Sequence, residues 1–128
     1  MSRGFDAIII GAGQAGPFLA LRLGEAGMKV AIVERKLFGG TCVNTGCTPT
    51  KTLVASARAS HLGRRAAEFG VVLGGDVGVD MKRITARQRA IVRARREGVE
   101  QLVIKQPNCR VNKGHARFES ARQMQGGR

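Results

Sequence analysis

The 128-residue chain contains no tryptophan and no tyrosine, and its aromatic side chains are five phenylalanines. Proteins that grip single-stranded nucleic acid stack the bases on aromatic side chains, so this scarcity argues against that function. No apolar run approaches the roughly 20 residues that cross a bilayer, which predicts no transmembrane helix. Asp6 and the glycines from residue 11 onward interrupt any signal-peptide core, so we expect folded structure from the start, in a cytoplasmic protein.

Acidic side chains are also few: nine Asp and Glu stand against 22 Lys and Arg, a formal net charge of +13. The imbalance lies mainly in residues 81–128, which have thirteen basic and three acidic side chains, against nine and six in residues 1–80. Such a basic segment can attract nucleic acid. A small basic module that binds nucleotide or nucleic acid without redox chemistry is therefore the alternative to the enzyme considered below.

Cysteines number only three, Cys42, Cys47 and Cys109, and no secretory signal accompanies them. In a reducing compartment a paired set of cysteines is more often catalytic or metal-binding than a structural staple. Two cysteines are half a zinc site, and Cys109, His61 and His115 have no usual ligand spacing, so we predict no metal. Cys109 is interpreted as a buried strand cysteine, and the two histidines as surface or packing residues.

The N-terminal third reads as one βαβ unit of an α/β fold. Phe5–Ile10 is a β-branched apolar run typical of a strand buried on both faces. Gly13–Gly27 has apolar residues at helical spacing, Phe18 and Leu19 among them, which predicts a helix with Gly27 as its C-terminal cap. Met28–Val33, ending at Glu34, predicts a second strand parallel to the first, joined to it by a right-handed crossover.

Beyond this unit the pattern is less regular. Glycines and polar residues predict an irregular loop after the second strand, and a second glycine-broken stretch interrupts the helical part of the chain. Apolar residues at helical spacing predict a long arginine-rich helix in the basic segment. The predicted elements are a loop over Arg35–Gly46, a helix capped by Thr48 and reaching about Leu62, a loose stretch over 70–78, a helix over 81–103, short strands at 110–111 and 115–118, and a polar tail over 123–128.

The loop after the first strand is a G-x-G-x-x-G sequence made by Gly11, Gly13 and Gly16. It follows a predicted strand, opens a helix, and has Glu34 at the end of the next strand, 23 positions after the first glycine. These are the features of a dinucleotide site: a tight turn, close approach to a pyrophosphate, helix–strand packing and a ribose acceptor. Unaided, the unit leaves open NAD, FAD, or a plain tight turn in an unrelated α/β protein.

The pair Cys42 and Cys47 is separated by four residues and comes directly after the second strand. In an ideal helix, residues five apart rise about 7.5 Å, more than the roughly 7 Å between α-carbons that a disulfide tolerates. The segment must therefore be distorted, and Gly46 is placed to allow this. A helix N-terminus beyond Thr48 and the cation of Lys51 would favour thiolate and lower a cysteine pKa. Incidental cysteines on an NAD dehydrogenase unit remain an alternative.

The stretch from Gly39 to Lys51, GGTCVNTGCTPTK, resembles the signature of the class I pyridine nucleotide-disulfide oxidoreductases, in particular the mercuric reductase and dihydrolipoamide dehydrogenase type. The segment 114–118, GHARF, resembles the family's later adenine-contacting segment. The resemblance implies a Rossmann-like FAD-binding fold with a parallel sheet. Because family members are several times longer, it also implies that 1–128 is a truncated N-terminal part, without the NAD(P)H-binding and dimerisation domains.

The resemblance further implies the residues that hold FAD. The glycine loop and the acidic residue that follows it would bind the diphosphate and ribose. The residues implied for the diphosphate and ribose are Gly11, Gly13, Gly16 and Glu34. Lys36 would lie beside the adenosine, and Thr41 beside the pyrophosphate. Lys51 would lie near the flavin's reactive edge, and Ala116 would contact the adenine.

For the cysteines, the resemblance implies that Cys42 is the thiol that meets substrate and Cys47 the charge-transfer thiol, with Lys51 nearby. Electrons would pass from NAD(P)H through FAD to this disulfide and on to a small-molecule or ionic substrate, such as mercuric ion or a disulfide. The expected partners are that substrate and a second copy of the full-length chain in a homodimer. Neither nucleic acid nor membrane is expected.

Overall fold

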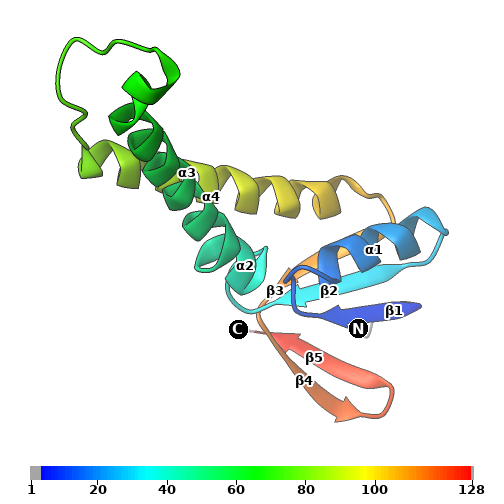
Figure 1. Ribbon diagram of the computed structural model, residues 1–128. Coiled ribbons are helices and arrows are strands. Elements are labelled where there is room, and N and C mark those ends of the chain that lie inside the picture. Colours follow the sequence, from blue (N-terminus) through cyan, green and yellow to red (C-terminus); the bar gives the residue numbers. More distant parts are fainter. Residues whose placement is uncertain (1–3, 128) are drawn as a thin grey trace.

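The computed structural model describes residues 4–127, and Figure 1 shows a small sheet with helices on one side and a separate hairpin. A three-stranded sheet has the order β1-β2-β3, and a two-stranded sheet pairs β4 with β5. The elements in chain order are β1 (Ala7–Ile10), α1 (Gly16–Glu25), β2 (Val30–Glu34), α2 (Gly40–Asn44), α3 (Cys47–Arg64), a short 3-10 turn η1 (Ala66–Phe69), α4 (Met81–Lys105), β3 (Cys109–Lys113), β4 (His115–Ser120) and β5 (Gln123–Gly127).

The predicted βαβ unit is present. β1 and β2 are parallel, with Ala7 opposite Val30 and Ile10 opposite Val33, and β3 adds a third parallel strand on the far side of β2. The central strand is fully enclosed: the residues from Val30 to Val33 are at most 3% exposed. The α/β fold class with a parallel, Rossmann-like sheet is confirmed.

The expectation that the first strand is buried on both faces is wrong. Ile8 and Ile10 are 43% and 52% exposed, whereas Ile9 packs against the core. β1 is an edge strand, and α1 covers only one of its faces. On the other face Ile8 and Ile10 line a cavity of about 400 Å³ between β1 and the β4–β5 hairpin.

α1 begins at Gly16, three residues later than predicted, and turns a different face to the sheet than its large apolar residues suggested. Its buried residues are Pro17, Ala20 and Gly24, while Phe18 and Leu19 are about half exposed. Small residues are needed there because the helix lies very close to its neighbours: a Cβ on Gly24 would come within 2.8 Å of a side-chain carbon of Gln106.

The predicted glycine cap of α1 is confirmed. Gly27 has a φ of 84°, its N–H donates to the carbonyl of Gly24, and the N–H of Met28 donates to that of Leu23. This pair of bonds is the Schellman pattern that ends helices at a left-handed glycine. It turns the chain directly into β2.

Two predictions between residues 35 and 64 are corrected. The segment expected to be irregular contains α2, and α3 begins at Cys47 with Gly46 as its N-cap, so Thr48 caps nothing. α2 can form because Gly39 and Gly40 have φ values of 88° and 56°, which let the chain turn sharply into a helix. The helix α3 extends to Arg64, slightly beyond the predicted end.

α4 starts where predicted, with the Asp80 carboxylate accepting from the N–H of Arg83 as an N-cap. Its apolar stripe is only partly buried: Val103 is fully enclosed, whereas Met81 and Leu102 are 59% and 50% exposed. The reason is visible in Figure 1, where the C-terminal end of α4 lies by the sheet and its other end extends away with α3. Among the described residues, no helix is long and apolar enough to cross a membrane.

The predicted polar tail is wrong, because residues 123–127 form β5. It pairs antiparallel with β4, with Phe118 opposite Met124. Composition failed to show this strand because hairpin pairing is carried by backbone hydrogen bonds, which polar and glycine residues make as well as apolar ones do. Arg128 lies outside the described residues.

Candidate dinucleotide and dithiol site

The glycine loop joins β1 to α1, and the conformational or steric reason for glycine differs at each of its three positions. Gly11 has a φ of 95°, a conformation that side chains rarely adopt, and its N–H donates to the Val33 carbonyl at 2.8 Å. At Gly16 a Cβ would lie 2.1 Å from the Gly11 carbonyl oxygen. Gly13 has nothing within 4 Å of its Cβ position, so the protein itself does not need glycine there.

The open side of this loop presents backbone donors. Within residues 4–127, no hydrogen-bond acceptor is recorded for the N–H groups of Gly13, Gln14 or Ala15. They precede the first turn of α1, where the helix dipole adds partial positive charge. Free N–H groups at a helix start, next to a glycine with empty space, are what a phosphate group requires.

Glu34, the last residue of β2, is held against this loop by both of its carboxylate oxygens. Oε2 accepts from the backbone N–H of Ala12 at 2.8 Å, and Oε1 accepts from that of Lys36 at 2.7 Å. The side chain of Lys36 is exposed, so its recorded contribution is its backbone donor. The carboxylate is thus fixed in place before any ligand arrives.

A cavity of about 340 Å³ opens beside Glu34 and brings together residues distant in the sequence. Ala116, at the start of β4, lies in its wall opposite the end of β2. Sequence reasoning missed Arg35 here, whose only signal was its position next to Glu34, and it included His115 only as part of the segment 114–118. The lining residues are Ile10, Gly11, Val33, Glu34, Arg35, Gly114, His115 and Ala116.

The segment that leads to the cysteines docks directly on the glycine loop. The N–H of Gly39 donates to the Ala12 carbonyl at 2.7 Å, and the Gln14 side-chain amide donates to the Gly39 carbonyl at 3.2 Å. A Cβ on Gly40 would lie 3.0 Å from the Cα of Gly13. The start of α2 and the glycine loop are therefore in contact, and the cysteine pair is tied to the same edge of the sheet as the loop.

Cys42 lies in α2 and Cys47 is the first residue of α3, both as free thiols. Between them the chain folds back: the N–H of Gly46 donates to the Thr41 carbonyl at 2.7 Å. A Cβ on Gly46 would come within 3.1 Å of that oxygen, so the close turn favours glycine. The expected distortion at Gly46 is confirmed, and the two thiols are close enough for Cys47 to influence the pKa of Cys42.

The pKa of Cys42 is raised above its ordinary value, mainly by the side-chain hydrogen bond with Cys47, then by desolvation and by the charge of Cys47. The Cys47 backbone N–H and the cation of Lys51 act in the opposite direction but do not prevail. The two influences that the sequence predicted, the helix start and Lys51, thus act on Cys42 in the predicted direction, but the net shift of its pKa is upward.

Removing the Cys47 side chain gives a testable result. In Cys47→Ala the pKa of Cys42 is expected to fall, because the raising contributions of the Cys47 side chain vanish while the lowering backbone N–H at position 47 remains. The alkylation rate of Cys42 by iodoacetamide, followed against pH by peptide mass spectrometry, should then reach its midpoint at lower pH. Cys47→Ser, which retains a hydrogen-bonding side chain, is the matched control; an equal or higher midpoint in the alanine variant would contradict the assignment.

A sequence profile of the family described as pyridine nucleotide-disulphide oxidoreductase matches residues 5–127. The chain belongs to this family. It is 36% identical over 124 residues to a dihydrolipoyl dehydrogenase of Acholeplasma laidlawii, covering 97% of this chain and 37% of that protein. It is 44% identical over 91 residues to the dihydrolipoyl dehydrogenase of Rhizobium etli, covering 71% of this chain and 19% of that protein.

Among solved structures, the chain is similar to the HOCl-induced flavoprotein disulfide reductase RclA from Escherichia coli, determined as a Cu(II) complex. The TM-score is 0.81 at 32% identity, covering 99% of this chain and 25% of the reductase. The chain thus spans between 19% and 37% of the length of these family members.

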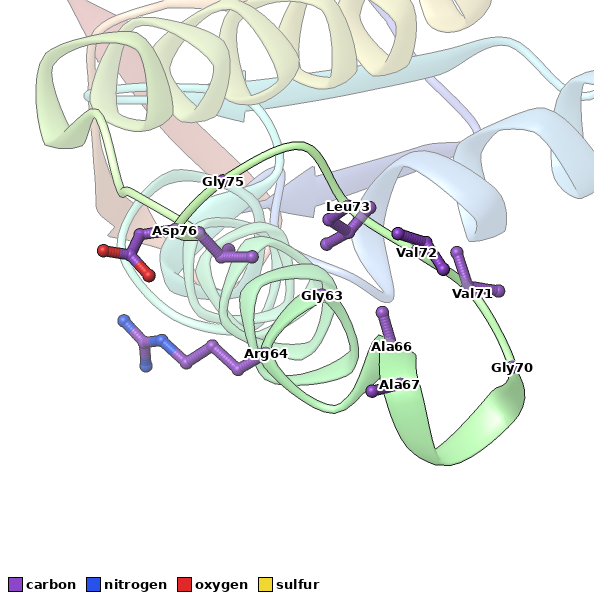
Figure 2. Close-up of a pocket in the computed structure, with 11 residues that line it drawn as sticks. Gly63, Arg64, Ala66, Ala67, Gly70, Val71, Val72, Leu73, Gly75 and Asp76 are labelled. Atoms are coloured by element: carbon purple, nitrogen blue, oxygen red, sulfur yellow. The ribbon is translucent and has the colours of Figure 1, made fainter.

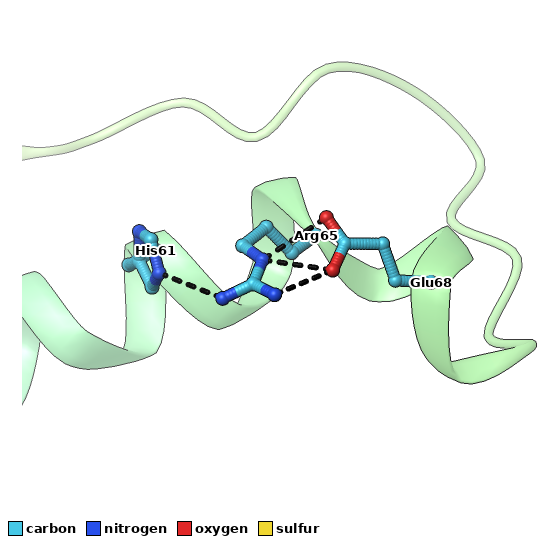
Figure 3. Close-up of polar contacts among 3 residues, drawn as sticks. All are labelled: His61, Arg65 and Glu68. Carbon is cyan, nitrogen blue, oxygen red and sulfur yellow. Dashed lines mark hydrogen bonds and ion pairs between the residues drawn. The ribbon is translucent and has the colours of Figure 1, made fainter.

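The remaining residues singled out from the sequence lie apart from the candidate site. Cys109 is in β3, as predicted; its thiol donates to the Ala20 carbonyl at 3.1 Å, and burial raises its pKa. His61 is an exposed residue of α3 whose ring contacts Arg65, which pairs with Glu68 at 2.5 Å (Figure 3). Within residues 4–127, no group of three potential metal ligands occurs.

A larger cavity, about 460 Å³, lies where the chain loops back after α3. Figure 2 shows Arg64 and Asp76 on one side of it, with Ala66, Val71 and Val72 on the other. None of its lining residues belongs to the glycine loop, the Glu34 cavity or the cysteine pair. Cavity size alone therefore does not single out the candidate site, which is defined by the backbone donors, the Glu34 carboxylate and the thiols.

Proposed function

We propose that this chain is the FAD-binding part of an NAD(P)H-dependent flavoprotein disulfide oxidoreductase that uses Cys42 and Cys47 as its redox dithiol. The observation that carries the proposal is the hydrogen-bonded contact between the glycine loop and the start of α2. It connects the proposed nucleotide-phosphate site directly to the segment that carries the cysteine pair. The description of the similar reductase RclA as a flavoprotein disulfide reductase supports the same combination.

The residues present fit FAD. The free N–H groups after Gly13, and the open space at that glycine, would receive the diphosphate. Glu34 would accept from the adenosine ribose, and the cavity between Glu34 and the Ala116 backbone would hold the adenine. The family resemblance adds Lys36 at the adenosine and Thr41 at the pyrophosphate, with Lys51 near the flavin. When bound, FAD supplies the two-electron transfer that links a nicotinamide donor to the cysteine pair.

The dithiol reduces its acceptor by thiol–disulfide exchange. Cys42, the proposed interchange thiol, attacks one sulfur of the acceptor as thiolate, and the first acceptor thiol leaves. Cys47 then attacks Cys42 in the mixed disulfide and releases the second. The description of RclA as a disulfide reductase favours a disulfide acceptor over mercuric ion, and the name of the similar dihydrolipoyl dehydrogenases likewise indicates dithiol–disulfide chemistry.

The complete activity belongs to a longer protein in this proposal, because the relatives extend well beyond the matched part. The nicotinamide site and the contacts between the two chains of a homodimer would be supplied by such further domains. We propose a cytoplasmic enzyme, because a reducing compartment keeps the dithiol available for turnover.

FAD binding by the chain tests the proposal. Wild-type chain is expected to quench flavin fluorescence saturably, and Gly13→Val to raise the Kd about tenfold or more, because its side chain would occupy the space left for the phosphates. Gly74→Val, at another glycine with nothing within 4 Å, is the matched control and should bind as wild type does. Absence of binding by the wild-type chain, or equal Kd values for Gly13→Val and wild type, would contradict the proposal.

A further inference from the structure

The turn over Phe38–Gly40, which lies between β2 and α2, is held by side-chain amides at three consecutive carbonyl oxygens. The Asn44 amide nitrogen donates to the carbonyls of Phe38 and Gly40, both at 2.9 Å. The Gln14 amide nitrogen donates to the carbonyl of Gly39 at 3.2 Å. One residue of the glycine loop and one residue between the two cysteines therefore hold the same short piece of backbone.

These bonds matter because α2 cannot fix its own position. It has only five residues, and a helix of that length is not stable without contacts from outside it. The turn before it contains Gly39 and Gly40, both in the left-handed region, and glycine has the largest conformational freedom of all residues. The orientation of α2, and with it the place of Cys42, is therefore set by the groups that bind the turn.

The other half of the Asn44 amide indicates what this side chain contributes. Its Oδ1 is buried and has no hydrogen-bond partner among residues 4–127. A buried acceptor without a partner is unfavourable, so an apolar side chain would be less unfavourable at this position if packing alone decided. The two bonds that its nitrogen donates to the turn are what asparagine adds here.

We infer that Asn44 and Gln14 are positioning residues for the dithiol. By holding the turn before α2, they keep Cys42 beside Cys47 while α2 stays in contact with the glycine loop. Neither side chain takes part in the exchange of electrons. The inference rests on the proposed function in that the two cysteines must be the redox dithiol, and it adds which residues set the ease of forming their disulfide.

The effect of these residues is expected in the equilibrium between dithiol and disulfide. Oxidised glutathione takes two electrons and two protons from the pair: its S–S bond breaks, a bond between Cys42 and Cys47 forms, and two molecules of reduced glutathione leave. The new bond joins α2 covalently to the start of α3. Without the amide bonds the dithiol therefore gains conformational freedom that the disulfide does not, and the equilibrium shifts toward the dithiol.

Equilibration with glutathione tests the inference on the chain itself. Protein with Cys109→Ser, in which Cys42 and Cys47 are the remaining thiols, is the reference. It is incubated without oxygen in mixtures of reduced and oxidised glutathione, and the disulfide fraction is read by intact-mass spectrometry after alkylation. Asn44→Ala should lower the equilibrium constant about tenfold, which is about 30 mV for a two-electron couple.

A second measurement on the same variant follows the alkylation of Cys42 against pH. Cys47 raises the pKa of Cys42, and in Asn44→Ala it is no longer held beside that thiol. The midpoint of alkylation should therefore lie at lower pH than in the reference. A side chain that only stabilised the fold would lower the midpoint of urea unfolding and leave both the equilibrium constant and this pH unchanged.

Asn108→Ala is the matched control, since the Asn108 amide also donates to a backbone carbonyl, that of Gly24 at the end of α1, at 2.9 Å. It should leave the equilibrium constant within about twofold of the reference. Gln14→Ala should shift the constant in the same direction as Asn44→Ala. Because both residues act on one turn, the double variant should show less than the product of the two single effects.

An unchanged equilibrium constant in either folded variant, or an equal fall in Asn108→Ala, would overturn the inference. Circular dichroism reports whether each variant is folded. If Asn44→Ala does not fold, Gln14→Ala decides alone, and a constant equal to that of the reference then refutes the positioning role. Failure of the reference itself to form the internal disulfide in oxidised glutathione would instead contradict the proposed function.

Discussion

Gly16→Ala is expected to destabilise the folded chain by about 3 kcal/mol or more. The added Cβ would lie 2.1 Å from the Gly11 carbonyl oxygen and 3.2 Å from the carbonyl carbon. The backbone of Gly11 is itself held in place by the hydrogen bond from its N–H to the Val33 carbonyl of β2. No flexible side chain can move aside to make room. Because a small domain has only about 5–15 kcal/mol of net stability, the midpoint of urea unfolding, followed by circular dichroism, should fall sharply.

Gly13→Ala in the same loop provides the comparison. Nothing lies within 4 Å of its Cβ position and its φ is not positive, so the urea midpoint should stay near that of wild type. The contrast between two glycines three residues apart separates packing from ligand space. A wild-type midpoint for Gly16→Ala would show that α1 does not approach β1 as closely as described.

Cys47→Ser is expected to abolish formation of the internal disulfide. With one molar equivalent of a small disulfide, the reference protein with Cys109→Ser should end as an unmodified chain lacking two hydrogens, because Cys47 displaces the second thiol. Without that thiol, Cys42 has no resolving partner, and the reaction should stop at the mixed disulfide. Intact-mass spectrometry distinguishes the two products by the mass of the adduct.

Cys109→Ser itself is expected to leave this chemistry intact. Its thiol bonds to the Ala20 carbonyl under α1, a contact that a serine hydroxyl can replace. Loss of the adduct from Cys47→Ser on the same time scale as from the reference would be incompatible with the assigned pair. Since α2 and α3 are fixed by Gly46 rather than by the sulfurs, both variants should retain the fold.

Local sequence determined most of the glycine-loop half of the candidate site. Spacing predicted a βαβ unit and a phosphate loop because the residues that define them are close together in the chain: the run Phe5–Ile10, the three spaced glycines and Glu34. The structure contains this βαβ unit. The end of α1 at Gly27 was equally readable, because a left-handed glycine after an apolar helix has a local cause. The cysteine spacing required a distortion, and Gly46 supplies it.

Predictions of burial from composition were wrong where the distance between packed elements, rather than hydrophobicity, decides which residues are buried. Phe18 and Leu19 read as core residues of α1, yet Ala20 and Gly24 are buried, because the helix lies too close to its neighbours for larger side chains. Ile8 and Ile10 read as buried, but β1 is an edge strand with one face beside a cavity. β5 has almost no apolar signal and forms through its backbone pairing with β4.

By itself, the sequence determined the βαβ unit, the glycine loop and the spacing of the cysteine pair, because each depends on residues close together in the chain. Only the tertiary structure decided that Gly39 binds Ala12, that Ala116 lies opposite Glu34, and that the α4 arginines border the cysteine helices. Those contacts join segments tens of residues apart. No local pattern encodes them, since they depend on how helices and strands pack.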